Sequence, residues 1–371
     1  MQKSFAITAL VAVFAQQVEA SKCYALALSS GDQNSMYQAG VLKAFADTYP
    51  AEEMAYSAVS GVSGGAINAV LLASFATGQE GAAADQMKKF WEDSANYKMY
   101  SSWLGREAEG LLWKGGLWND DNTLTFVKDQ FANMTPNQRW VDVGLTDALK
   151  GTFVDFKSED LVGDQLYNVM FGQFAGAGVF PPAEFNNTDY FDGSTIWDLD
   201  IFSVVNQCQS KGFADEDIVV DTILTSEKTL PVVDASGYHS LQMLWRYLSV
   251  SRYYSNMDGL LRAQFAYPKV NFRNIVAPTA DMPSSWYPLN LNQKNVDEIY
   301  ALGVTDGTAS AGSTTDASET TQFFALKKKN DRTLGDASFQ KFIEMKNNGE
   351  IAAEHDLHLD SRLKALVGKT F

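Results

Sequence analysis

The chain has 371 residues, of which 46% are apolar, so it is long enough to bury a substantial hydrophobic core. Its formal net charge of −16 argues against a nucleic-acid partner, because binding to phosphates requires clustered Lys and Arg. The same charge disfavours electrostatic docking on anionic membranes, so contact with lipid would be transient and apolar.

The first twenty residues have the pattern of a secretory signal peptide. Lys3 precedes an apolar run over residues 5–14, and residues 18–20 supply small side chains where a signal peptidase would cut. The run is too short to span a membrane. We expect residues 1–20 to be removed and the protein to enter the secretory pathway, ending outside the cell or in a vacuolar or phagosomal lumen. An uncleaved anchor is the alternative.

Two strand–loop–helix units follow. Residues 24–28 form a short apolar run typical of a buried strand, and helical spacing of apolar residues over 36–45 predicts a helix. A second strand is expected over 56–60 and a second helix over 66–75. Two such units in succession predict an α/β fold with a mostly parallel sheet.

The rest of the main domain mixes both kinds of element. Further strands are expected at residues 140–145, 152–156, 218–224 and 270–275, with a hairpin turn at Lys150-Gly151. Helical patterns cover residues 84–94, 160–171, 198–208, 239–256 and 295–302. Because no clean boundary interrupts this order, we expect one domain over residues 21–305.

The composition changes abruptly after this domain. Residues 305–318 contain no apolar side chain larger than Ala, so they cannot pack a core of their own. We expect a Ser/Thr/Gly-rich linker over residues 306–319 and a polar, partly helical tail over residues 320–371.

Residues 59–69 read VSGVSGGAINA and contain the spacing of a nucleophile elbow. Gly61, Gly64 and Gly65 permit the sharp turn that presents the hydroxyl of Ser63 at the end of a strand. The helix that follows directs the positive end of its dipole to the same point. Ser63 is therefore the candidate nucleophile, and a tight turn without chemistry is the alternative.

A serine nucleophile needs a base. The chain has three histidines, and His239 lies in the main domain, whereas His355 and His358 lie in the tail. A Ser-His-Asp esterase that uses His239 is one alternative. Asp192 is the better candidate, because burial beside its aromatic neighbours would raise the pKa of the carboxyl and make it a stronger base. Taken alone, its Asp-Gly pair is typical of a turn.

Four segments in this order resemble the patatin-like phospholipases. They are MYQAGVLKAF (36–45), the elbow, GVFPP (178–182) and YFDGS (190–194). The resemblance extends over residues 23–302. It implies a three-layer fold in which helices flank a central, mostly parallel sheet.

The resemblance also implies a lipid acyl hydrolase with a Ser–Asp dyad. Ser63 would attack a phospholipid or another fatty-acyl ester and form an acyl-enzyme, with Asp192 as general base. No metal or organic cofactor is implied.

The loop SSGDQNS (residues 29–35), called the opening loop below, departs from the family pattern. In the family, a loop of the form G-G-G-x-K/R-G supplies backbone N–H groups to the oxyanion, and the resemblance gives this role to Ser30, Gly31 and Asp32. Only Gly31 matches the pattern, and Asn34 replaces the basic residue. A weakened or inactive lipid-binding or storage protein is therefore the main alternative to an active hydrolase.

A segment over residues 90–118 is rich in aromatic residues and glycine. Trp103, Leu111, Leu112 and Trp113 are candidates for the wall of an acyl pocket or for a lid, since neighbouring glycines would let the segment move. Ordinary core is the alternative.

Two further features agree with an oxidising, glycosylating compartment. Cys23 and Cys208 are the two cysteines of the chain, and we expect them to form a disulfide rather than remain as free thiols. Asn133 and Asn186 begin glycosylation triplets, of which the first is the poorer because Pro136 follows it.

Overall fold

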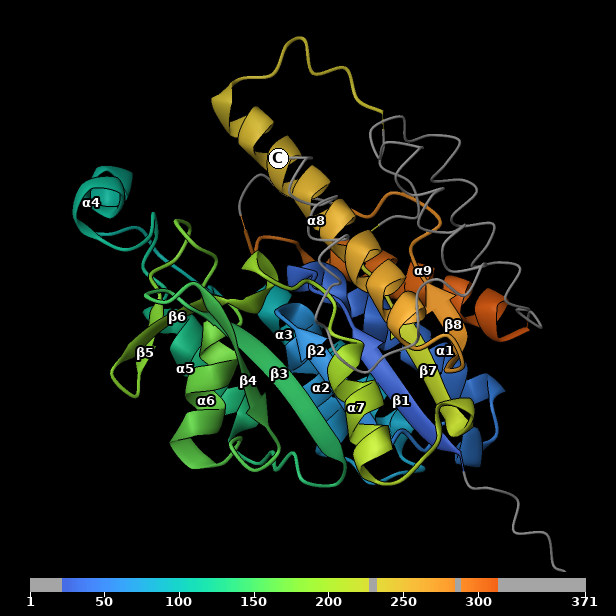
Figure 1. Ribbon diagram of the computed structural model, residues 1–371. Coiled ribbons are helices and arrows are strands. Elements are labelled where there is room, and N and C mark those ends of the chain that lie inside the picture. The colour runs from blue at the N-terminus through green and yellow to red at the C-terminus, as the bar shows by residue number, and fades with distance from the viewer. Residues whose placement is uncertain (1–21, 227–231, 284–287, 313–371) are drawn as a thin grey trace, which may run out of the picture.

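The computed structural model describes residues 22–226, 232–283 and 288–312 (Figure 1). The expected signal peptide and tail, with His355 and His358, lie outside the described residues. So do residues 313–319 of the expected linker. Among the helices that are described, none is both long enough and apolar enough to cross a membrane.

A mixed eight-stranded sheet forms the centre of the fold, in the order β5-β6-β3-β2-β1-β7-β8, with β4 paired to β3. The neighbours β3, β2, β1, β7 and β8 run parallel, whereas β4 and β6 run antiparallel to β3. The parallel strands at the centre are buried on both faces, which explains their nearly continuous apolar sequences. The strands are β1 (Cys23–Leu28), β2 (Ala58–Val62), β3 (Trp140–Asp147), β4 (Thr152–Lys157), β5 (Ala183–Phe185), β6 (Thr188–Asp192), β7 (Ile218–Ile223) and β8 (Asn271–Val276).

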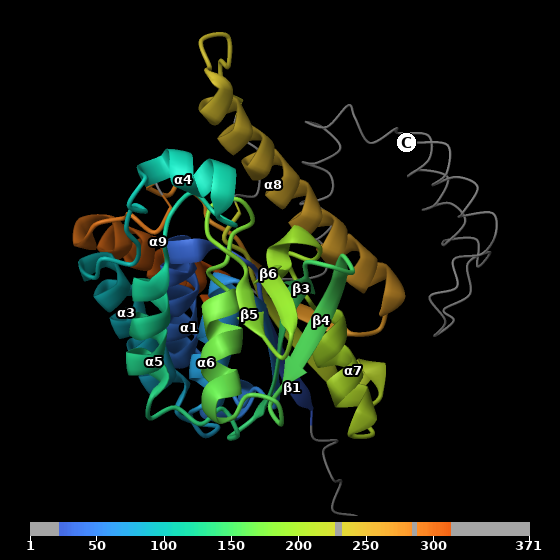
Figure 2. The ribbon, with the colours of Figure 1, turned by 90° about the vertical axis from the view of Figure 1, so that its left-hand side faces the viewer.

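Helices cover both faces of this sheet, so the α/β fold has three layers as expected (Figure 2). One face carries α1, α2, α3, α5, α6 and α9, and the other carries α7 and the C-terminal half of α8. The helices are α1 (Met36–Thr48), α2 (Gly64–Ala73), α3 (Glu80–Asn96), α4 (Arg106–Trp113), α5 (Asp121–Phe131), α6 (Gly163–Gly172), α7 (Phe202–Ser210), α8 (Ser240–Ala266) and α9 (Gln293–Gly312).

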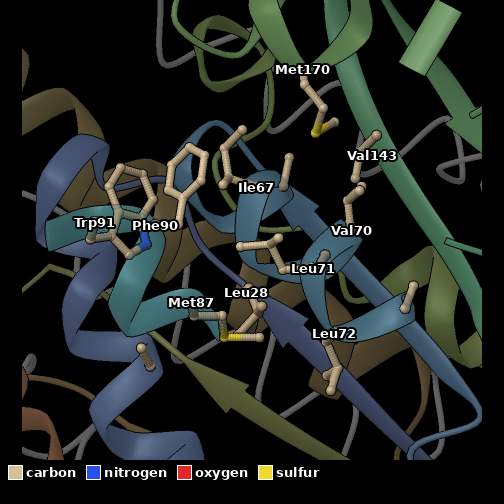
Figure 3. Packing of buried hydrophobic residues seen from close by; sticks show 14 of the residues in the cluster. Leu28, Ile67, Val70, Leu71, Leu72, Met87, Phe90, Trp91, Val143 and Met170 are labelled. Carbon is tan, nitrogen blue, oxygen red and sulfur yellow. The ribbon is translucent and has the colours of Figure 1, made fainter. Parts of the chain in front are cut away.

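Helix α2 is buried along its whole length. Figure 3 shows Ile67 and Val70 of α2 packed with Phe90 of α3 and Val143 of β3. A helix that is apolar on every side is typical of the interior of a protein. The elbow at the start of α2 therefore rests on a rigid support.

The β5–β6 hairpin was not expected from the sequence. Asn186 and Asn187 adopt φ angles of 52° and 57°, which suit a two-residue hairpin turn. The hairpin matters because β6 pairs with β3 and places Asp192 opposite Leu145. Asn186 is exposed at this turn, and Asn133 is also exposed.

The structure corrects the expected linker at residues 306–312, which form the end of α9. This helix approaches α1 very closely, since a Cβ added to Gly303 would lie 2.2 Å from the carbonyl oxygen of Tyr37. Asp306 is buried and accepts a hydrogen bond of 2.9 Å from the Tyr37 hydroxyl. The small residues here permit helix packing instead of preventing it.

Cys23 at the start of β1 and Cys208 of α7 form a disulfide, with an S–S distance of 2.06 Å. Both residues are buried in the core between the sheet and α7. The bond links the first strand of the fold to a helix that lies 185 residues away in the sequence.

Candidate active site

Ser63 occupies the sharp turn between β2 and α2. Its φ of 56° and ψ of −129° are unusual for a residue with a side chain, and strain of this kind is typical of a nucleophile elbow. The backbone N–H of Ser63 donates to Oε1 of Gln173 at 2.8 Å. Gln173 follows α6 and was not singled out from the sequence.

The glycines of the elbow are required by close backbone contacts. A Cβ on Gly61 would lie 2.2 Å from the carbonyl oxygen of Gly65, and a Cβ on Gly65 would lie 2.4 Å from that of Ser29. A Cβ on Gly64 would lie 2.3 Å from the Ser35 hydroxyl and 2.6 Å from the carbonyl oxygen of Asp32. The elbow is thus packed directly against the opening loop.

Asp192 lies at the end of β6, next to Ser63. Its side chain is buried, and burial raises the pKa of the carboxyl to about 6. Hydrogen bonds from the Ser194 N–H, at 2.9 Å, and from the Ser63 side chain lower this pKa, while the nearby charge of Asp32 raises it. Asp192 is therefore an ionised but basic carboxylate at neutral pH and lies beside the candidate nucleophile. In this structure the Ser63 hydroxyl donates to the backbone carbonyl oxygen of Gln173 at 3.4 Å.

The opening loop lies between β1 and α1 and contains a short 3₁₀ turn, Asp32–Ser35. The backbone N–H of Ser30 donates to the carbonyl oxygen of Asp198 at 3.0 Å, so Ser30 is not a free oxyanion donor and that expectation is wrong. The N–H groups of Gly31 and Asp32 have no hydrogen-bond partner among the described residues. Of the three expected oxyanion donors, these two amides remain.

Asp198 anchors the loop from the segment that follows Asp192. The Ser30 hydroxyl donates to its Oδ1, and the Thr225 hydroxyl donates to the carbonyl oxygen of Ser30. Burial raises the pKa of Asp198 to about 6. Nothing in the local sequence indicated that this carboxylate would hold the loop.

Arg252 of α8 brings a positive charge to the site. Its Nη2 lies 3.9 Å from Oδ2 of Asp32, and its Nε lies 3.9 Å from Oδ1 of Asp198. Burial opposes the charge, but Asp32, Asp198 and Asp192 together raise the pKa of Arg252. The Asp32 side chain is 51% exposed, so it points partly to solvent beside a cation.

Residues 26–202 match the family model of the patatin-like phospholipases. This segment is a patatin-like phospholipase domain. It contains Ser63, Asp192 and the whole opening loop. Arg252 lies beyond the matched segment.

Two solved structures are similar to the chain that carries this patatin-like domain. VipD from Legionella pneumophila is 12% identical, with a TM-score of 0.40, and the alignment covers 79% of this chain and 67% of VipD. The type III effector protein ExoU is 11% identical, with a TM-score of 0.31, and the alignment covers 78% of this chain and 53% of ExoU. No curated protein matches the chain.

The expected wall of an acyl pocket lies mostly on the surface of the patatin-like domain. Leu111, Leu112 and Trp113 of α4 are 73%, 63% and 74% exposed, so the structure does not place them in an enclosed pocket. Trp103 is partly buried and donates through Nε1 to the carbonyl oxygen of Gly116 at 3.1 Å. A surface hollow of about 420 Å³ lies beside α4 and is lined by Gly105, Ala108, Glu109, Trp113 and Lys114.

His239 is not placed to act as the base of this patatin-like site. It is exposed and caps the N-terminus of α8, where its backbone N–H donates to Oε1 of Gln242 at 2.8 Å. Arg252, which reaches the site, lies about 20 Å farther along the helix at 1.5 Å per residue. The structure therefore contradicts the alternative of a Ser-His-Asp triad through His239.

Proposed function

We propose that the protein is a lipid acyl hydrolase that cleaves fatty-acyl esters, with phospholipids as the main substrate class. The patatin-like phospholipase domain supports hydrolysis of lipids in general. The observation that carries the specific mechanism is the contact between Ser63, held in an elbow conformation, and the buried carboxylate of Asp192. The dyad removes the need for a histidine.

In this mechanism Asp192 accepts the hydroxyl proton of Ser63 while the oxygen attacks the ester carbonyl. The tetrahedral intermediate then collapses to an acyl-enzyme and expels the alcohol, which takes the proton from Asp192. Water activated by the same carboxylate attacks the acyl-enzyme and releases the fatty acid.

The oxyanion is stabilised by the amides of Gly31 and Asp32 and by the charge of Arg252. One oxyanion donor is worth about 10²–10³ in rate. A single cation about 6 Å from the oxyanion would add roughly 3 kcal/mol at an effective dielectric constant near 20, and the carboxylates of Asp32 and Asp198 beside Arg252 offset part of that gain. Arg252 thus supplies from α8 the charge that Asn34 does not supply from the loop.

Exposed apolar side chains are suited to contact with a lipid surface. Helix α4 exposes Leu111, Leu112 and Trp113. Helix α8 exposes an apolar face that ends one turn before Arg252 and comprises Met243, Leu244, Tyr247 and Leu248. Both views place α4 and the N-terminal half of α8 at the same end of the molecule (Figures 1 and 2). The net charge of −16 favours zwitterionic over anionic lipid.

We also propose that the protein acts in the secretory pathway or outside the cell. The sequence of residues 1–20 and the disulfide between Cys23 and Cys208 support this location, because disulfides persist mainly in oxidising compartments.

The test is covalent labelling with a fluorophosphonate, combined with release of fatty acid from phosphatidylcholine vesicles. Wild-type protein should be labelled at Ser63 and release fatty acid. Ser63→Ala should lose labelling and at least about 10³-fold in rate. Ser74→Ala, at the other end of α2, is the matched control and should retain both. A folded wild-type protein that binds fatty acid but is neither labelled nor active would instead be an inactive lipid-binding or storage protein.

A further inference from the structure

A second group of carboxylates lies apart from the dyad. Asp142 of β3, Asp155 of β4 and Asp200, just before α7, place one ligand oxygen each within 4.8 Å of one another. Asp155 is opposite Gly144 in the β3–β4 pair, so Asp155 and Asp142 lie on the same face of the sheet. The β3–β4 hairpin and the segment before α7, which lies far from it in the sequence, thus converge at this point.

Asp142 has an unsatisfied oxygen in this group. Its side chain is 2% exposed, and its Oδ1 has no hydrogen-bond partner among the described residues. Ser203 hydrogen-bonds to the side chains of both Asp142 and Asp200, and Lys157 is the cation that acts on Asp142 and Asp155. One lysine does not balance three carboxylates, and an unpaired buried carboxylate oxygen is costly.

We propose that Asp142, Asp155 and Asp200 bind one calcium ion. Calcium binds oxygen ligands at 2.3–2.6 Å, so two oxygens on opposite sides of the ion are separated by up to roughly 5 Å. Magnesium has shorter bonds and requires nearly ideal octahedral geometry, which suits this set of oxygens less well. Calcium takes six to eight oxygens, and the exposed side of Asp155 leaves room for water to supply the rest.

The ion would have a structural role. Asp200 closes the segment that begins with Asp192 and includes Asp198, and the carbonyl oxygen of Asp200 accepts a hydrogen bond from the Ser60 hydroxyl of β2. A calcium ion shared with β3 and β4 would fix this segment to the sheet. It would therefore stabilise the fold at the part of the chain that carries the candidate base and the loop anchor.

The experiment is thermal unfolding of the purified full chain after chelation, in titrations with calcium chloride or magnesium chloride. Calcium at about 100 times its Kd should raise the Tm of the wild type by roughly 5 °C, and magnesium should raise it less. Calorimetric titration should give one calcium ion per chain.

Asp142→Asn and Asp155→Asn should remove the calcium response, whereas Asp164→Asn, on the exposed start of α6, should retain it. Asp142→Asn should still fold without calcium, because an amide replaces the unsatisfied carboxylate. The proposal fails if the wild type shows no response to calcium or if Asp142→Asn responds equally. A wild type without a response, together with a higher Tm for Asp142→Asn, would show that the carboxylates share a proton instead. None of these measurements depends on the enzymatic activity.

Discussion

The two loops that follow the neighbouring strands β1 and β2 are built in different ways. The elbow after β2 turns on residues that are adjacent in the chain, since Gly61 approaches the backbone of Gly65 and Ser63 takes its strained conformation between them. Gly64 and Gly65 also pack against the opening loop. The opening loop after β1 is held by side chains from distant parts of the chain, namely Asp198, Thr225 and Arg252. The residues that form the turn at the elbow are therefore neighbours in the chain, whereas the side chains that hold the opening loop come from distant segments.

This difference concerns charge as well as shape. Around the elbow, the acidic group is the buried Asp192, whose raised pKa suits it to accept a proton. Around the opening loop, Arg252 lies 3.9 Å from both Asp32 and Asp198 and offsets part of their negative charge. We infer that the elbow side provides the reacting groups and the loop side controls the charge around them, so mutations on the two sides should differ in size and in pH dependence.

The largest effect is expected on the elbow side. Asp192→Asn removes the general base and should lower kcat/KM by about 10²–10⁴-fold. In the wild type, kcat/KM should fall about tenfold per pH unit below pH 6, because the pKa of Asp192 is raised to about 6 and the base must be ionised. Fatty-acid release between pH 4.5 and 8, at roughly half-unit steps, measures this profile.

The same variant should not be less stable at neutral pH. A carboxyl whose pKa rises from 3.8 to about 6 on folding stabilises the fold below pH 3.8, and this stabilisation is lost as the pH rises to 6. Ionised Asp192 therefore costs roughly 3 kcal/mol at pH 7, and Asn relieves part of that cost. Asp189→Asn, on the same strand, is the control. Full activity in Asp192→Asn would show that Asp192 is not the base.

The sequence allowed the elbow side to be predicted closely because its determinants are adjacent in the chain. Apolar runs predicted β1 and β2, and the glycine spacing predicted the turn at Ser63. The Asn-Asn turn of the β5–β6 hairpin was missed, although asparagine adopts positive φ angles more often than most residues with a side chain. The small residues of α9 were misread as a linker, because their packing partner on α1 lies far away in the sequence.

On the loop side, the sequence showed what was absent but not what replaced it. The family pattern showed directly that Asn34 stands where a Lys or Arg is expected. Arg252 belongs to no recognisable motif, and it reaches the loop only because α8 folds back over it. Asp198 at the loop and Gln173 at the elbow were missed for the same reason, since each contacts the site through the tertiary fold.

An intermediate effect is expected for Arg252. Arg252→Ala should lower kcat/KM by about 10–100-fold, because the oxyanion loses a nearby cation. It should also move the acidic limb of the pH profile to higher pH, since Arg252 lowers the pKa of Asp192. Arg252→Lys retains the charge and should recover most of the rate. Arg262→Ala, ten residues later on α8 and 70% exposed, is the matched control. An unchanged rate and an unchanged pH profile in Arg252→Ala would show that Arg252 has no role in catalysis.

The smallest effect is expected from the anchor of the loop. Ser30→Ala removes the hydroxyl that donates to the buried Asp198, and a hydrogen bond to a charged group contributes about 1.5–3 kcal/mol. Because the backbone N–H of Ser30 still donates to the carbonyl oxygen of Asp198, we expect a loss of stability of about 1–2 kcal/mol and less than a tenfold loss of kcat/KM.

Denaturant unfolding and initial rates of fatty-acid release measure the two quantities separately. Ser210→Ala is the control, because Ser210 is exposed and its hydroxyl donates to the carbonyl oxygen of Gln207 in the same helix, so this variant should change neither quantity. If the side chain of Ser30 only supports the loop, stability should fall more than catalysis. A hundredfold loss of activity at unchanged stability would mean instead that this hydroxyl acts on the oxyanion itself, and the division between a reacting elbow and a supporting loop would have to be given up.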